Sequence, residues 1–311
     1  MAAGLDLEMP SSGGVGAAAV HRALEAGTLT EAEVDRAVTR VLELVSRSQA
    51  ALAPGQTYDE AAHHTLAREA AAASVVLLKN TDATLPLDPA AGGAVAVVGE
   101  FARSPRFGGG GSSQVTPTRL DDALSALREQ VTGREVRFAP GFTLSDETPA
   151  DEARALLDEA VAAARDAAVA VVFLGLPDAY ESEGYDRDHM HLPPQQVAVL
   201  EAVAAVAERV VVVLTNGSVV EVGPWQHHAH ALVESWLLGQ AGGGAVADVL
   251  TVRSTRRGSW PRPCRSASST TPPSATSPAT GRRSATARAS SSATAGTTRT
   301  RCRWPTPSGT A

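Results

Sequence analysis

The sequence predicts an α/β fold over residues 58–250, with a mostly parallel sheet covered by helices on both faces. Two observations lead to this prediction. Short apolar runs rich in β-branched residues alternate along the chain with longer amphipathic segments. The short runs are also continuously apolar, as is typical of strands buried on both faces. Such alternation implies right-handed crossovers, and it places binding residues at the carboxyl ends of the strands.

The expected elements follow one another in regular order. Helices are expected at about 58–73, 120–131, 149–167, 193–208 and 245–250. Strands are expected at about 74–80, 94–99, 135–139, 169–174, 210–214 and 231–237. Together they would form one layered domain with its sites at one edge of the sheet.

Two further helices are expected before this domain, at 15–26 and 31–46. The second has a clear start, because Thr30 and Glu33 have the spacing of a capping box. Its apolar residues fall on one helix face, and they are Val34, Val38, Val41, Leu42 and Val45. So short a segment offers no obvious partner for this apolar face.

The charge distribution divides the chain into two parts. The whole chain has a formal net charge of −7. Residues 251–311 contain eleven Arg and no Lys, Asp or Glu, so residues 1–250 carry 16 basic and 34 acidic side chains. The acidic part does not have the charge of a nucleic-acid-binding protein. The tail lacks Leu, Ile, Phe and Tyr, cannot build a core, and is expected to be disordered.

The sequence also limits compartment and redox chemistry. It has no run of 18 or more apolar residues and no basic segment leading into an apolar one at its start. We therefore expect neither a membrane span nor a secretory signal, and a cytoplasmic location. Both cysteines, Cys264 and Cys302, lie in the tail. Residues 1–250 thus offer no thiol for a disulfide, a nucleophile or a metal.

The segment at 177–194, after the strand expected at 169–174, is the richest in reactive side chains. It holds five carboxylates, with Arg187 as its one Lys or Arg. Like charges held close together raise the pKa of at least one carboxyl, which can then serve as a general acid. A solvated acidic loop is the alternative. The carboxylates are Asp178, Glu181, Glu183, Asp186 and Asp188.

Residues Gly108–Gly111, followed by Ser112 and Ser113, have some likeness to a phosphate-binding loop. The match is poor, since no Lys follows the last glycine and the glycines do not directly follow the strand expected at 94–99. A flexible loop that closes over a neighbouring surface is favoured instead.

His227, His228 and His230 resemble a metal cluster, but no carboxylate or cysteine nearby completes a ligand set. We therefore expect no metal. Gly242–Gly244 would allow a helix start to approach the sheet closely.

Five stretches together resemble the family-3 glycoside hydrolases of β-glucosidase type, in the family's order and over most of residues 1–250. They are 3–10 (AGLDLEMP), 74–80 with 85–87 (LPL), 95–100 with 108–113, 181–187 (ESEGYDR) with 192–193, and 236–250. This resemblance implies a (β/α)8-type barrel joined to an α/β sandwich, with the active site between them. It also implies a retaining mechanism and no cofactor or metal.

The resemblance assigns roles to particular residues. Glu183 corresponds to the acid/base on the sandwich loop, with Glu181 in reserve. The family's nucleophile is a barrel Asp upstream of the stretch matching Gly4–Pro10, so no nucleophile is expected in this chain. Residues 1–57 would be the end of the barrel with linker helices, 58–250 the sandwich, and 251–311 the tail.

The tail is further interpreted as an out-of-frame translation. Joining the last base of each codon to the first two of the next permits GAVNPSGKLAETLPLRLE from Val252 onward and VPVAYPFGHG from Arg301 onward. Both strings resemble the family's continuation, so we expect one base to be missing just after the Leu250 codon.

The expected function is therefore that of a β-glucosidase-like hydrolase acting on a small β-glycoside. Neither nucleic acid nor membrane is an expected partner. The chain alone should be inactive without a separately encoded barrel fragment. Three alternatives stay open. These are a non-catalytic sugar- or partner-binding module, a nucleotide-binding domain using residues 108–113, and nucleic-acid binding through the arginine-rich tail.

Overall fold

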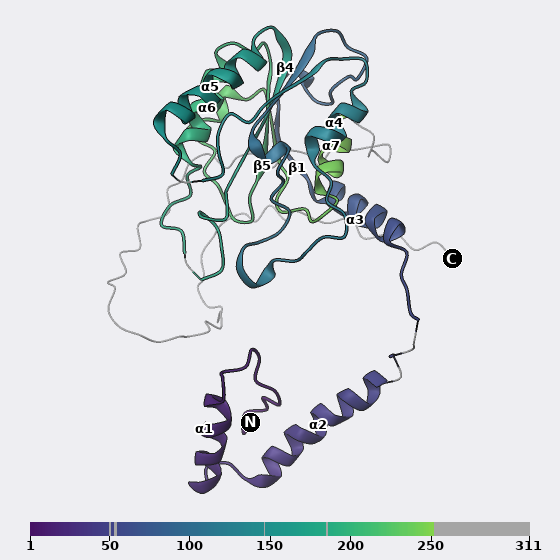
Figure 1. Ribbon diagram of the computed structural model, residues 1–311, viewed down its shortest axis with the longest axis vertical. Helices are drawn as coiled ribbons and strands as arrows, with labels where there is room; N and C mark the ends of the chain where they lie inside the picture. Colours follow the sequence, from purple (N-terminus) through teal and green to yellow (C-terminus); the bar gives the residue numbers. More distant parts are fainter. Residues whose placement is uncertain (50, 53–54, 146, 185, 252–311) are drawn as a thin grey trace, which may run out of the picture. The chain divides into compact units, whose positions relative to one another are not determined.

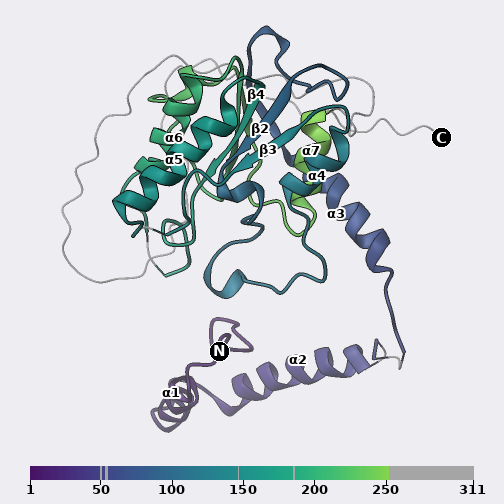
Figure 2. The same cartoon turned by 45° about the horizontal axis from the view of Figure 1, so that its top comes forward.

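The computed structural model describes residues 1–49, 51–52, 55–145, 147–184 and 186–251, and Figures 1 and 2 show it from two directions. Its centre is a six-stranded sheet in the order β1-β6-β5-β4-β2-β3. All neighbouring strands are parallel except β1 and β6, which are antiparallel. The predicted α/β fold is confirmed. The strands are β1 (Val76–Asn80), β2 (Ala94–Val98), β3 (Val136–Ala139), β4 (Ala167–Gly175), β5 (Val210–Thr215) and β6 (Ala231–Glu234).

Helices cover both faces of the sheet (Figures 1 and 2). On one face α5 (Ala150–Ala164) packs beside α6 (Pro194–Ala204). The other carries α3 (Glu60–Ser74), α4 (Ala123–Gln130) and α7 (Gly242–Thr251), with α7 in contact with both α3 and α4. Because both faces are covered, every residue of β2 and β5 is buried, which explains their unbroken apolar sequences.

Some element boundaries differ from those expected. The strand expected from Ser74 begins at Val76, because α3 continues to Ser74. The last strand stops at Glu234, and the last helix begins at Gly242 rather than at Ala245. No α-helix separates β5 from β6, so the alternation of strand and helix is not strict.

The two N-terminal helices are α1 (Val15–Glu25) and α2 (Glu31–Gln49). The capping box of α2 is confirmed. The Thr30 N–H donates to Glu33 Oε2 at 2.8 Å, and the Glu33 N–H donates to Thr30 Oγ1 at 3.3 Å. Along the apolar face of α2, Val38, Leu42 and Val45 are exposed.

Within the described part of the chain, no helix combines the length and the hydropathy needed to cross a membrane. The predicted out-of-frame tail lies outside the described residues from position 252 onward, and so do Cys264 and Cys302.

Candidate active site

The candidate site lies where the parallel strands β2, β4, β5 and β6 end at the same edge of the sheet. The loop after β4 carries the two glutamates expected from sequence. A buried glutamine anchors the start of this loop: Gln196 Oε1 accepts from the Gly175 N–H, and Gln196 Nε2 donates to the Gly175 oxygen, both at 2.9 Å. These two bonds join the end of β4 to the first turn of α6. The loop therefore leaves the sheet from a fixed point.

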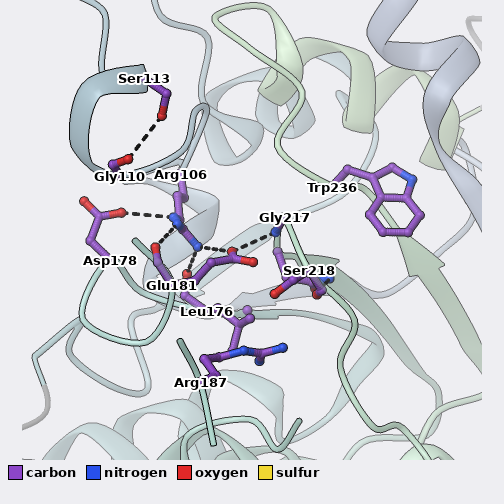
Figure 3. Close-up of polar contacts among 12 residues, drawn as sticks. Arg106, Gly110, Ser113, Leu176, Asp178, Glu181, Arg187, Gly217, Ser218 and Trp236 are labelled. Carbon is purple, nitrogen blue, oxygen red and sulfur yellow. Dashed lines mark hydrogen bonds and ion pairs between the residues drawn. The ribbon is translucent and has the colours of Figure 1, made fainter. Parts of the chain in front are cut away.

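Arg106, which follows β2 in the chain, is the centre of the polar contacts at this edge (Figure 3). Its side chain is only 6% exposed. Nε donates to Asp178 Oδ1 at 3.0 Å, and Nη1 donates to the Leu176 oxygen at 2.6 Å. Nη1 also donates to Glu181 Oε2 at 2.6 Å, and Nη2 to the Glu181 main-chain oxygen at 2.5 Å. One guanidinium thus fixes the loop at three positions.

Glu181 is held from two sides. Besides Arg106, its Oε2 accepts from the Gly217 N–H at 2.8 Å, in the turn after β5 (Figure 3). Burial acts to raise the pKa of Glu181. Hydrogen bonds from the Ser218 hydroxyl, the Gly217 N–H and Arg106 outweigh burial, so the pKa is lowered. Glu181 is therefore an ionised, firmly held carboxylate.

Glu183 has a different environment, on the exposed side of the same loop. Its Oε2 accepts from the Ser112 N–H at 2.7 Å. Hydrogen bonds from the Ser112 hydroxyl and N–H lower the pKa of Glu183 below its usual value. A Cβ placed on Gly111 would lie 2.6 Å from the Glu183 Cβ. The glycine-rich loop thus packs against the acidic loop.

The electrostatics of the acidic loop differ from the expectation. A raised pKa was expected for a member of this carboxylate cluster, yet the pKa values of both candidates, Glu181 and Glu183, are lowered. The reason is that donors from other segments reach them. Arg106 also adds a cation from outside the loop, since it pairs with Asp178 as well as with Glu181.

The other charged residues of the loop point elsewhere. Arg187 Nη2 donates to the Val219 oxygen at 2.6 Å. Asp188 lies 3.7 Å from His189 Nε2. Asp186 is exposed. The structure therefore brings Asp178 and Glu181 together around Arg106, whereas Asp188 lies near His189.

Sequence reasoning missed a buried glutamate at this edge, Glu234, the last residue of β6. Its Oε1 accepts from the Trp236 N–H at 2.9 Å, and its Oε2 accepts from Asn216 Nδ2 at 3.2 Å. Burial raises its pKa to about 7, with a smaller contribution from the charge of Glu181, although the two hydrogen bonds oppose the shift. The carboxyl with the raised pKa therefore lies in a strand.

Two signals in the sequence could have pointed to these residues. Glu234 is the one charged residue in the apolar run at 231–238, and a buried charge calls for partners. Asn216 and Gly217 directly follow the strand at 210–215, where the fold places binding groups. Arg106 carries no comparable signal.

The histidines and the glycine triplet have structural roles. His230 Nδ1 accepts from the Val210 N–H at 3.1 Å, and the rings of His227 and His228 contact each other. Among the residues that the structure describes, no group of three or more His, Cys, Asp or Glu could hold a metal. Gly243 approaches the Asp121 oxygen at the start of α4. The close approach is therefore made to a helix start, not to the sheet as expected.

Comparison with known proteins identifies the family of the chain. Residues 75–294 match the family model described as the glycosyl hydrolase family 3 C-terminal domain. The chain belongs to glycoside hydrolase family 3. A solved family-3 β-glucosidase from Bifidobacterium adolescentis superposes with a TM-score of 0.72 at 44% identity, over 81% of this chain and 36% of that one.

Curated relatives within family 3 are similar over the same part of the chain. An exo-α-(1→6)-L-arabinopyranosidase from Bifidobacterium longum is 48% identical over 256 residues, which is 80% of this chain and 33% of the relative. Thermostable β-glucosidase B from Acetivibrio thermocellus is 46% identical over 250 residues, covering 80% and 32%. The chain thus spans about a third of the length of these glycoside hydrolases.

Proposed function

We propose that this chain supplies the acid/base carboxylate of a retaining glycoside hydrolase that releases a terminal sugar from small β-glycosides. Glu183 is the proposed proton donor, and accessibility is the observation that supports this choice. Glu183 is exposed at the carboxyl edge of the sheet, where a sugar can reach it. The Glu181 carboxylate is held by Arg106 and Gly217 instead, and it serves the loop as an anchor.

The lowered pKa of Glu183 is compatible with this role once the nucleophile is present. In a retaining enzyme the two carboxyl groups stand about 5–5.5 Å apart. A second carboxylate at that distance, together with burial by the barrel and the sugar, raises the pKa of the first. Glu183 would therefore become protonated in the complete site and ionised in this chain alone.

The nucleophile and most of the sugar-binding surface are proposed to come from a (β/α)8-type barrel that lies outside these 311 residues. The supporting fact is that the chain spans about a third of its family-3 relatives. Double displacement needs both carboxylates, on opposite sides of the bond to be broken. We therefore expect turnover only when the barrel polypeptide is added.

A reconstitution experiment tests this proposal. The full chain is mixed with a barrel polypeptide prepared from thermostable β-glucosidase B, and hydrolysis of alkyl and 2,4-dinitrophenyl β-glucosides is measured. Glu183→Gln should lower turnover of the alkyl glucoside about 10²- to 10⁴-fold. The kcat/KM of the dinitrophenyl glucoside should be affected far less, because its leaving group needs no proton in the step that forms the glucosyl-enzyme.

Controls separate Glu183 from its neighbours. With the dinitrophenyl glucoside, azide should raise the turnover of Glu183→Gln and give the β-glucosyl azide, because the anion attacks the glucosyl-enzyme without help from a general base. The exposed Glu208, at the opposite end of the sheet, should tolerate Glu208→Gln. Azide rescue of Glu181→Gln, with Glu183→Gln fully active, would give the acid/base role to Glu181.

A non-catalytic binding module is the second candidate, and the lowered pKa values of Glu181 and Glu183 favour it. Ionised carboxylates accept hydrogen bonds from sugar hydroxyls without donating a proton. Calorimetric binding of glucose to the chain, with no turnover after the barrel is added, would support this candidate.

A further inference from the structure

A series of hydrogen bonds leads from the end of β6 to the acidic loop. Asn216 is fully buried, and its Nδ2 donates to Glu234 Oε2 at 3.2 Å and to the Ser218 oxygen at 3.0 Å. The next residue, Gly217, donates its N–H to Glu181 at 2.8 Å. One asparagine therefore links Glu234 to the turn that holds Glu181.

From Glu181 the series continues to the loop itself. Arg106 binds both the carboxylate and the main-chain oxygen of Glu181. The main chain is thereby fixed two residues before Glu183, whose own carboxylate then meets the Ser112 N–H at 2.7 Å. A change in the Gly217 turn would therefore be transmitted to Glu183.

We propose that Glu234 is a positioning residue for the acid/base loop, acting through Asn216 and the Gly217 turn on Glu181. The proposal rests on the proposed function only for the role of Glu183. Glu234 itself is 6% exposed and does not line the exposed side of the loop. It follows Leu232 and Val233 in a buried strand, where an apolar residue would satisfy packing. Its carboxyl instead binds the Trp236 N–H and Asn216 Nδ2.

The charge of Glu234 should control how firmly the Gly217 N–H binds the Glu181 carboxylate. Glu181 is the charged group that acts on Glu234, while Asn216 and the Trp236 N–H are its neutral partners. Two carboxylates repel each other when both are ionised. Since burial places the pKa of Glu234 at about 7, its ionisation above neutral pH should loosen the Gly217 turn.

Amide hydrogen exchange of the full ¹⁵N-labelled chain, followed by NMR, tests the proposal. In the unsubstituted chain, the protection factor of the Gly217 amide should fall as pH rises through about 7. Glu234→Gln should abolish that step, because its side chain does not titrate. Glu234→Ala should lower the protection about tenfold or more, as for the loss of a hydrogen bond to a charged group, with the Val212 amide of β5 unchanged.

Two results would overturn the proposal. One is a pH step that persists unchanged in Glu234→Gln, and the other is full protection of Gly217 in Glu234→Ala. If Glu234→Ala does not fold, the pH step in Glu234→Gln still tests the proposal. Glu208→Gln is the control for the loss of one negative charge. The measurement needs no turnover, so failure of azide rescue at Glu183 would leave its result intact.

Discussion

Arg106 binds Glu181 through two separate groups, its Nη1 to the carboxylate at 2.6 Å and its Nη2 to the main-chain oxygen at 2.5 Å. The contact spans 75 positions in sequence, and it joins the segment after β2 to the loop after β4. Such a pair fixes main chain and side chain together. It therefore holds Glu181 as an anchor, so that Glu183 is left exposed on the same loop.

Removal of Arg106 should be strongly destabilising. Arg106→Met leaves the largely buried Glu181 carboxylate, 17% exposed, without its cation, and breaking such a pair costs about 3–5 kcal/mol. Urea unfolding measures the free energy of unfolding. Arg154→Met is the matched control, because Arg154 pairs with Asp158 on the surface of α5 and should contribute about 0–1 kcal/mol. Equal losses in the two variants would contradict the central role of Arg106.

Gly111→Ala should disturb Glu183 directly. Gly111 has a φ of +78°, and an added Cβ would lie 2.6 Å from the Glu183 Cβ. The backbone alone costs about 1–2 kcal/mol for an L-residue. The hydrogen bonds from Ser112 should weaken, so the pKa of Glu183 should rise, as followed by its ¹³C carboxyl shift.

Gly108→Ala provides the control for this change. Its added Cβ meets no atom within 4 Å, and its φ is not in the left-handed region. Both the thermal midpoint and the Glu183 titration should stay as in the unsubstituted chain. A Glu183 pKa that is the same in Gly108→Ala and Gly111→Ala would contradict the contact between the two loops.

Glu234 should give the chain a characteristic pH dependence of stability. Its pKa is about 7 in the folded chain and returns to its ordinary value of about 4.5 in the unfolded chain. The folded state then binds the extra proton between these values, so stability falls as pH rises from about 4.5 to 7 and levels off above. The loss is about 3 kcal/mol, because each pH unit between the two pKa values is worth about 1.4 kcal/mol.

Comparison of the unsubstituted chain with Glu234→Gln isolates this contribution. The difference in unfolding free energy between the two should change with pH in favour of Glu234→Gln on going from pH 5 to pH 8. The pKa of Glu181 is lowered, so Glu181 makes stability rise with pH. This contribution is present in both chains and cancels in the comparison. A difference that does not vary with pH would show that Glu234 is ionised throughout.

Gene sequencing tests the interpretation of the tail. We expect one base to be missing just after the codon of Leu250, in a reading frame that otherwise continues as family-3 sequence. An intact base count across that codon, in the gene and in the transcript, would remove this interpretation.

Most of the sheet could be predicted because each parallel strand carries its own signal. The valine-rich runs of β2 and β5 are apolar at every position because both faces are covered. The antiparallel pairing of β1 with β6 could not be predicted, since nothing in the sequence of β1 indicates which strand it pairs with or in which direction. Nor could the end of α3 at Ser74, because the Ser74 hydroxyl bonds back to the Ala70 oxygen within the helix.

The sequence predicted where the candidate site lies, but it did not predict the pKa values of its carboxylates. The position of Glu181 and Glu183 after β4 followed from the fold and the family resemblance. Their lowered pKa values come from Arg106, Gly217 and Ser112, which lie on other loops. Charge counting along one segment cannot include such donors, and so the raised pKa expected for at least one of the five carboxylates does not occur at Glu181 or Glu183.

Covalent trapping tests most directly the claim that Glu183 acts with a nucleophile outside these 311 residues. The full chain, alone and with the barrel polypeptide, is treated with a 2-deoxy-2-fluoro-β-glucosyl fluoride, and the labelled peptide is located by mass spectrometry. The account predicts no label on the chain alone, and label on an aspartate of the barrel in the mixture. A glycosyl ester on any aspartate of the 311-residue chain would contradict it.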